Sequence, residues 1–235
     1  MDKLQLFCIT HAGGTASFFR ELSGLLEPKL DVHALEYAGH GTRQKEPLYE
    51  NVDAMIKDIA FLIKEKRNPS IPYMVFGHSM GSMVAYETLT RYFLEDTPSH
   101  VFLASHTPPP IPYEGESYAL LSDEDFIDKM YQFGALDKRL MEDQRFRSIY
   151  LPRIRADYRY LHEYHWTDGH RKFPCDITVF YSTEDIEAEV VCQWHLHTEG
   201  SVKLFEFSGG HFFLRSNGAE VTNKILAVAD SIPSC

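Results

Sequence analysis

A G-H-S-M-G pentapeptide at residues 77–81 constrains the fold of this chain more than any other feature of its sequence. The apolar run Tyr73 to Phe76 precedes it, and apolar residues follow it at helical spacing. Its two glycines allow a sharp turn from a strand into a helix, which holds a serine hydroxyl exposed in a strained conformation. A glycine-rich turn with Ser79 as a helix cap would also fit, so the pattern alone is only moderately specific. The position between a strand and a helix favours Ser79 as a nucleophile.

Short β-branched or aromatic runs alternate with segments of helical spacing along the chain. Such alternation is typical of a mostly parallel sheet with helices on both faces, so we predict an α/β fold. The predicted strands are Leu4 to Ile9, Val32 to Tyr37, Tyr73 to Phe76, Val101 to Ala104, Ile177 to Tyr181 and Val202 to Phe207. The predicted helices that cover them are Ala16 to Leu26, Val52 to Lys66, the segment after Ser79, Ala188 to His197 and Ala219 to Ser231.

A stretch of about seventy residues between the fourth and fifth predicted strands carries no strand pattern. Two segments inside it, Asp123 to Phe133 and Met141 to Tyr164, have helical periodicity and acidic starts. We therefore predict a helical insertion over the sheet, a lid, from about Thr107 to Pro174. A chain of 235 residues with 44% hydrophobic content can bury one substantial core, so we expect residues 1–235 to form a single domain that includes this lid.

Charge and cysteine content exclude several classes of partner and site. The formal net charge of -11 argues against binding to nucleic acids or anionic membranes, since no basic run offsets it. The sequence has no 18-residue apolar stretch and no signal-peptide pattern, so we expect a soluble, cytoplasmic protein. We also expect a monomer, because no unusual apolar stripe is left over once the core is assigned. The cysteines, Cys8, Cys175, Cys192 and Cys235, form no C-x-x-C pair, so we expect neither a metal site nor a disulfide framework.

A serine is a weak nucleophile at neutral pH and needs a base to accept its proton. In hydrolases built on an α/β sheet, the partners follow in the chain order serine, acid, histidine. Among the later histidines, His211 lies in a G-G-H-F-F turn between a predicted strand and the final helix, which makes it the predicted base. His106 is the other histidine near a strand end.

The acid should lie just past a strand between the serine and the histidine. The segment S-T-E-D at residues 182–185 follows the predicted strand Ile177 to Tyr181, and Asp185 is the predicted acid. It would fix the tautomer of the imidazole and stabilise the imidazolium without taking the proton itself. Glu184 is an alternative, and Asp157 a more distant one.

Acyl transfer passes through a tetrahedral oxyanion, which backbone amides can stabilise. We predict an oxyanion hole formed by the backbone N–H groups of Met80 and of Ala12, which lies in the H-A-G-G turn at residues 11–14. Glycine pairs after a first strand are also common simply as turns.

The predicted lid is rich in aromatic rings and arginines. Most of the rings are expected to pack in the core and a minority to line an acyl channel. The arginines are candidates for contact with an acidic partner or a phosphate, although solvated helix faces often carry such charges. The rings are Tyr150, Tyr158, Tyr160, Tyr164 and Trp166, and the arginines are Arg139, Arg145, Arg147, Arg153 and Arg155.

Taken together, these residues resemble the type II thioesterases that accompany nonribosomal peptide and polyketide synthases, within the α/β-hydrolase superfamily. The likeness covers nearly the whole chain and is carried by residues 11–14, 39–47, 77–81, 151–157 and 209–214. In the family's pattern, nucleophile, acid and base fall on Ser79, Asp185 and His211. One departure is His40, where members of the family usually carry arginine.

The resemblance implies hydrolysis of acyl groups from the phosphopantetheine arms of acyl or peptidyl carrier proteins, which clears stalled units from a synthase. It implies no cofactor of the enzyme's own. Alternatives are a thioesterase of fatty acid synthesis that acts on acyl carriers, a small-molecule esterase or lipase, and a non-catalytic docking protein of a synthase. Because a thiolate leaves more easily than an alkoxide, the triad residues alone do not separate a thioesterase from an esterase.

Overall fold

A computed structural model describes residues 3–109, 117–135, 139, 142–166 and 172–233. Six strands in this part of the chain form one sheet in the order β2-β1-β3-β4-β5-β6, and every neighbouring pair is parallel. The strands are β1 (Gln5–Ile9), β2 (Asp31–Ala34), β3 (Tyr73–His78), β4 (His100–Ala104), β5 (Ile177–Tyr181) and β6 (Val202–Glu206).

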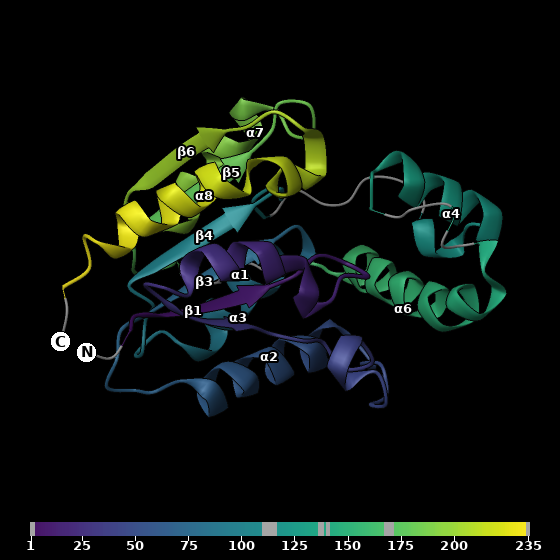
Figure 1. Ribbon diagram of the computed structural model, residues 1–235, viewed down its shortest axis with the longest axis horizontal. Helices are drawn as coiled ribbons and strands as arrows, with labels where there is room; N and C mark the ends of the chain where they lie inside the picture. The colour runs from purple at the N-terminus through teal and green to yellow at the C-terminus, as the bar shows by residue number, and fades with distance from the viewer. Residues whose placement is uncertain (1–2, 110–116, 136–138, 140–141, 167–171, 234–235) are drawn as a thin grey trace.

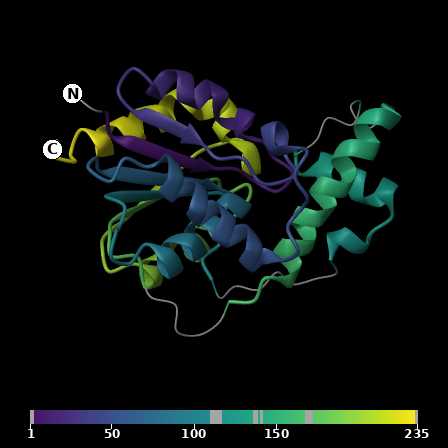
Figure 2. The same ribbon diagram turned by 90° about the horizontal axis from the view of Figure 1, so that it is seen from below.

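Helices cover both faces of the sheet, because successive side chains of a strand point to opposite faces and both sets are apolar. In β1, Leu6 and Cys8 pack in one buried cluster with α1 (Arg20–Leu26) and α8 (Leu214–Ala229). Phe7 and Ile9 pack in the other, with α2 (Val52–Lys66) and α3 (Met80–Tyr92). Both ribbon views show these two helical layers (Figure 1, Figure 2). The predicted mostly parallel sheet with helices on both faces is confirmed.

Several element boundaries differ from the sequence prediction. The last helix begins at Leu214 rather than near Ala219, with non-helical angles at Asn217, where two helical segments meet at a kink. The predicted helix at residues 188–197 is α7 (Ala188–Val191) followed by a 3-10 helix (Cys192–His197). The segment at 16–26 likewise starts with a 3-10 helix (Ala16–Phe19) before α1.

The described part of the chain between β4 and β5 is helical. A 3-10 helix (Tyr118–Leu120), α4 (Asp123–Gln132) and α6 (Gln144–Glu163) lie beyond the carboxyl ends of the strands, apart from the two layers that cover the sheet (Figure 1, Figure 2). Residues 110–116, 136–138, 140–141 and 167–171 of the predicted insertion, including the predicted helix start at Met141, lie outside the described residues, as does Cys235.

Apolar side chains join α4 to α6. Phe126, Ile127 and Met130 of α4 form a small buried cluster with Leu151 and Ile154 of α6. None of the described helices combines the length and the apolar character needed to cross a membrane.

Candidate active site

Ser79 lies in a strained turn between β3 and α3. Its φ of 55° and ψ of -123° are unusual for a residue with a side chain and cost on the order of 1–3 kcal/mol. The turn is anchored by its own backbone, since the Ser79 N–H donates to the carbonyl of Ala104 at 2.7 Å. The strain persists because the surrounding structure, including this hydrogen bond to β4, holds the turn in place.

The flanking glycines are required by close backbone contacts. A Cβ atom at Gly77 would lie 2.4 Å from the carbonyl oxygen of Gly81, and one at Gly81 would lie 2.0 Å from the carbonyl oxygen of Ile9. No side chain fits at either position without moving the backbone. These contacts bring the start of α3 directly against the end of β1.

Three side chains from three strand ends form a continuous hydrogen-bonded series. Nε2 of His211 lies 2.8 Å from Oγ of Ser79, and Nδ1 lies 3.0 and 2.9 Å from the two carboxylate oxygens of Asp185. A carboxylate can only accept, so Nδ1 carries the proton and Nε2 of the neutral ring is free to accept the serine hydroxyl. The structure thus brings Ser79, His211 and Asp185 together in the order that the sequence predicted.

The alternative acids and base have other contacts. Glu184 accepts the backbone N–H of Gly209 at 3.1 Å, which holds the turn before the histidine. His106 points Nδ1 at the carbonyl oxygen of Thr107, 2.6 Å away, and burial lowers its pKa to about 4. Asp157 contacts the loop after β1 and not His211.

A cavity of about 470 Å³ lies beside this triad, lined by Ser79, Asp185 and His211. Its other walls come from α3, from the end of α6 and from the segment that follows α6. Three of the rings singled out in the sequence face it, which is more than the minority we predicted. The aromatic residues of the lining are Tyr86, Tyr118, Phe133, Tyr158, Tyr164, Trp166 and Trp194.

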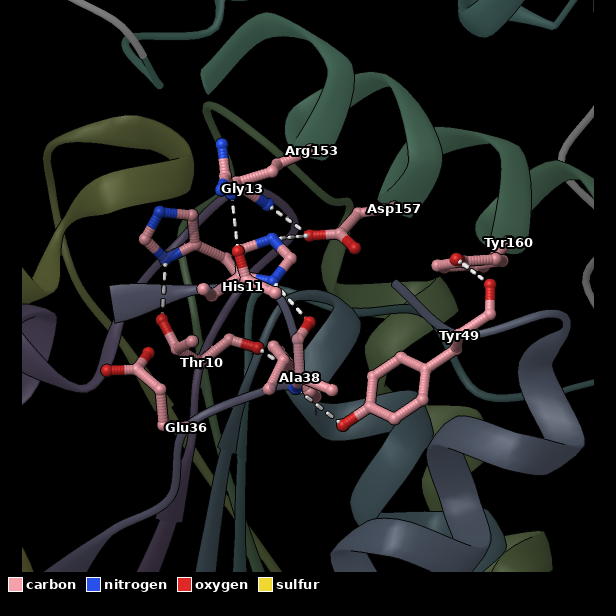
Figure 3. A network of polar contacts seen from close by, with 12 residues as sticks. Thr10, His11, Gly13, Glu36, Ala38, Tyr49, Arg153, Asp157 and Tyr160 are labelled. Carbon is pink, nitrogen blue, oxygen red and sulfur yellow. Dashed lines mark hydrogen bonds and ion pairs between the residues drawn. The ribbon is translucent and has the colours of Figure 1, made fainter. Parts of the chain in front are cut away.

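The remaining two predicted rings pack away from the cavity. Tyr160 is fully buried and donates its hydroxyl to the carbonyl of Tyr49 (Figure 3). Tyr150 stacks on Phe146 with ring centroids 4.1 Å apart. Tyr160 therefore ties α6 to the segment before α2, whereas the Tyr150–Phe146 pair lies within α6 itself.

The predicted oxyanion amides belong to two buried residues next to the triad. Met80 is the first residue of α3, and Ala12 follows β1 in a turn closed by a 3.0 Å hydrogen bond from Gly14 N–H to the carbonyl of His11. Within the described residues, neither the Ala12 nor the Met80 amide donates to a protein acceptor. Neither residue is among those that line the cavity, and the oxyanion role stays a prediction.

Sequence reasoning missed two contacts around the site. Ser105, with φ of 53°, donates its hydroxyl to the carbonyl of His211 at 2.8 Å. Asp157 of α6 accepts the backbone N–H of Gly13 at 2.7 Å (Figure 3). A small polar residue just past a strand end was the available signal for Ser105, whereas no local pattern pointed to the partner of Asp157.

Neutral histidines lie next to the triad. Burial lowers the pKa of His11 to about 3, with smaller effects from the charges of His211 and Arg215. The same causes, with burial again the largest, hold the pKa of His78 well below its usual value. The ring of His78 lies 5.7 Å from that of His211 and 5.8 Å from that of His11. His78, with His11 beyond it, therefore presents an uncharged ring to His211 at neutral pH.

Several of the lid arginines are engaged within the chain. Arg147 and Arg155 both contact the carboxylate of Asp123, at 3.2 and 2.8 Å. Arg153 donates to the carbonyl of Gly39. These three guanidinium groups stabilise the lid and its contact with the loop after β2.

Comparisons with known proteins agree with this geometry. A family model described as the thioesterase domain matches residues 4–228. The gramicidin S biosynthesis protein GrsT of Aneurinibacillus migulanus is 31% identical over 224 residues, which cover 93% of this chain and 86% of that protein. The medium-chain S-acyl fatty acid synthase thioesterase of Homo sapiens is 29% identical over 219 residues, which cover 89% of this chain and 80% of that protein.

A solved structure shows the same arrangement in space. The type II thioesterase BorB from the borrelidin biosynthetic cluster superposes with a TM-score of 0.86 and 27% identity, covering 97% of this chain and 93% of that chain. The fold is that of the α/β hydrolases, with the strand-to-helix turn and the serine that this fold uses. A family match over almost the whole chain, on this fold, shows that the chain belongs to the thioesterase family and is a serine-type hydrolase.

Proposed function

We propose that this protein hydrolyses the thioesters that join acyl groups to the phosphopantetheine arms of carrier proteins, as an editing type II thioesterase of a nonribosomal peptide or polyketide pathway. The observation that carries the proposal is the hydrogen-bonded series Ser79–His211–Asp185 beside an aromatic cavity. The similarity to GrsT, a gramicidin S biosynthesis protein, and to BorB, a type II thioesterase of the borrelidin cluster, supports this assignment of the pathway.

In the proposed acylation step, Oγ of Ser79 attacks the thioester carbonyl carbon as its proton passes to Nε2 of His211. Asp185 holds the imidazole and stabilises its cationic form. The backbone amides of Ala12 and Met80 bind the oxyanion. Collapse of the tetrahedral intermediate breaks the C–S bond, and the proton on Nε2 of His211 goes to the departing sulfur.

Deacylation repeats the sequence with water. His211 takes a proton from the water as its oxygen bonds to the acyl carbon, and returns the proton to Oγ of Ser79 as the ester bond breaks. The products are a carboxylic acid and a free phosphopantetheine thiol. Side chains and water supply every atom and proton of this route, so we expect it to need no cofactor of the enzyme's own.

Docking of the carrier protein must rest on local contacts. Carrier proteins are generally acidic, and this chain has a formal net charge of -11, so long-range electrostatics opposes rather than favours their encounter. We expect the protein to act as a monomer, with the carrier arm reaching the cavity from outside.

The test compares three substrates that share one acyl group: a thioester of a carrier protein, a thioester of coenzyme A and a nitrophenyl ester. We expect the highest kcat/KM on the carrier protein and loss of hydrolysis in Ser79→Ala. Ser99→Ala, at the opposite end of the sheet before β4, is the matched control and should behave as wild type. Hydrolysis that survives Ser79→Ala would falsify the nucleophile assignment.

A second candidate is an acyl-carrier thioesterase of fatty acid synthesis, favoured by the similarity to the human medium-chain enzyme. A panel of acyl groups on one carrier separates the two. Editing predicts broad hydrolysis of short and aberrant acyl units, whereas chain termination predicts a sharp preference for one chain length.

A non-catalytic docking protein is tested by covalent labelling with an organophosphonate. If the protein were such a scaffold, wild type would be labelled no more than Ser79→Ala.

A further inference from the structure

Asp157 is a buried carboxylate outside the triad that contacts the predicted oxyanion loop. It lies in α6 with a fully buried side chain, and its Oδ2 atom accepts the Gly13 N–H at 2.7 Å (Figure 3). The same oxygen lies 3.0 Å from Nε2 of His40, which is also buried. Oδ1 accepts no hydrogen bond from the described residues. One oxygen atom therefore connects the lid helix to two loops.

The contacts of His40 favour its positively charged form. Its Nδ1 atom lies 3.1 Å from the carbonyl oxygen of Ala38, and its Nε2 atom faces Asp157. The Ala38 carbonyl and an ionised Asp157 both place oxygen acceptors against the ring, an arrangement that suits protons on both nitrogens. The Nε2–Oδ2 contact has the distance of an ion pair without the alignment of a hydrogen bond, so it contributes mainly through charge.

The surroundings of His40 support the charged form. Burial alone would lower its pKa, but contact with Asp157, the Ala38 carbonyl and the negative charge of Glu36 raise the pKa above its usual value. The ring of Tyr37 lies 6.0 Å away, and Arg153 of α6 binds the carbonyl of the preceding residue. The two carboxylates thus outweigh both desolvation and the nearby guanidinium.

Asp157 selects one conformation of the loop after β1. Gly13 is the third residue of the turn from His11 to Gly14, and its φ of 72° is that of a type II turn. Types I and II differ by a flip of the central peptide, here the one between Ala12 and Gly13. After such a flip, the Ala12 carbonyl would replace the Gly13 N–H in front of the carboxylate, which is repulsive.

Close packing ties this loop to the lid helix. A Cβ atom at Gly13 would lie 2.7 Å from Cγ1 of Ile154, which precedes Asp157 by one turn of α6. The loop can approach α6 this closely only because it has glycine here. The position of the loop therefore depends on the position of α6.

We propose that Asp157, paired with the His40 imidazolium, is a positioning residue that fixes the turn from His11 to Gly14 through the Gly13 N–H, and thereby keeps the Ala12 N–H, one peptide earlier in that turn, aligned for the oxyanion. It couples that alignment to the position of the lid helix. The inference rests on the proposed function, since it takes Ala12 as an oxyanion donor. Asp157 itself does not touch the reacting atoms.

The test measures kcat and KM of Asp157→Asn and Asp157→Ala on an acyl-coenzyme A thioester. Loss of an oxyanion donor costs about 10²–10³ in kcat, so misalignment of one should cost roughly 10–100-fold, with KM changed less than about threefold. Asp143→Ala is the matched control, because Asp143 caps the first turn of α6 without contacting the loop. The proposal is overturned if folded Asp157 variants keep kcat within about twofold of wild type, or if Asp143→Ala lowers kcat equally.

The role of the charge is tested at His40. In wild type, kcat should decline as pH rises through the pKa of His40, whereas His40→Arg carries a permanent charge and should keep its activity there. His40→Gln should be impaired at every pH, and a wild-type pH profile in His40→Gln would overturn the charged pair.

Ser79→Ala distinguishes failure of the proposed function from failure of this inference. Hydrolysis that persists in Ser79→Ala contradicts the proposed function. Hydrolysis that is lost in Ser79→Ala but unchanged in the Asp157 variants contradicts only this inference.

Discussion

The hydroxyl of Ser105 donates to the backbone carbonyl of His211 at 2.8 Å, across 106 positions of sequence. Ser105 follows β4 and is buried, and its backbone has the left-handed φ of 53°. A second strained residue beside Ser79 thus holds the main chain of the proposed base. Asp185 holds the imidazole ring of His211, and Ser105 holds the backbone of the same residue.

Ser105→Ala is expected to lower both stability and kcat. The variant leaves the carbonyl of His211 without its donor, which costs about 1–3 kcal/mol, and frees the histidine to move. Ser105→Gly removes the same hydroxyl but relieves the backbone strain. If the hydroxyl matters for catalysis, the two variants should lose kcat equally while Ser105→Gly has the higher Tm. Recovery of kcat in Ser105→Gly would contradict the role of the hydroxyl.

Substitutions at Asp185 and Glu184 separate the two candidate acids. Asp185→Asn should lower kcat by about 10²–10⁴, because an amide does not fix the tautomer that the serine requires. Glu184→Gln keeps an oxygen that can accept the Gly209 N–H, so its kcat should fall less than about tenfold. A larger loss in Glu184→Gln than in Asp185→Asn would reverse the assignment.

Gly81→Ala should destabilise the protein strongly. Its Cβ atom would lie 2.0 Å from the Ile9 carbonyl oxygen, and overpacking of this kind costs about 1–3 kcal/mol or more. Gly24 lies in α1, and a Cβ atom added there would meet no other atom within 4 Å, so Gly24→Ala should stabilise by roughly 0.5–1 kcal/mol. Thermal unfolding of both variants checks the opposite signs.

Stability should fall between pH 7.0 and 5.5. Burial lowers the pKa of His11 to about 3 and of His100 and His106 to about 4, and holds that of His78 well below its usual value. Below the unfolded pKa near 6.5, the unfolded chain binds protons that the folded protein does not, so each group removes about 1 kcal/mol over this interval. His40, whose pKa is raised, acts in the opposite direction and offsets part of the loss.

Urea unfolding at the two pH values measures this loss. His100 lies at the amino end of β4, distant from the proposed site, and contacts Thr178 Oγ1 at 2.8 Å. His100→Gln should therefore reduce the difference in free energy of unfolding between pH 7.0 and 5.5 by about 1 kcal/mol. An unchanged difference would mean that His100 does not titrate as described.

The strand ends were readable from the sequence because local patterns mark them. Ser79 and His211 lie in glycine turns that follow apolar runs, and Asp185 follows the run that became β5. Parallel strands bring their carboxyl ends to one edge of the sheet, so three separate local patterns were enough to group these residues.

The contact between Asp157 and Gly13 could not be predicted in the same way. The two residues are 144 positions apart, and the lid helix that carries Asp157 reaches the core through packed side chains such as Tyr160 rather than through strand pairing. The number of rings that face the cavity was underestimated for the same reason. Helical periodicity gives the faces of α6 but not which face meets the core.

The cavity beside the triad is the expected binding site of the acyl chain. Leu161, on α6, lines the cavity and is half-buried, so the larger ring in Leu161→Trp should fill part of the cavity without disrupting the core. The loss in kcat/KM should be largest for the longer acyl chains, since each displaced methylene is worth about 1–3 kcal/mol in binding. We expect kcat/KM for an octanoyl thioester to fall at least about tenfold relative to an acetyl thioester. Glu163→Trp, two residues further along α6 and half exposed, is the control and should leave the ratio unchanged. Equal losses for both thioesters in Leu161→Trp would mean that the acyl chain does not occupy this cavity.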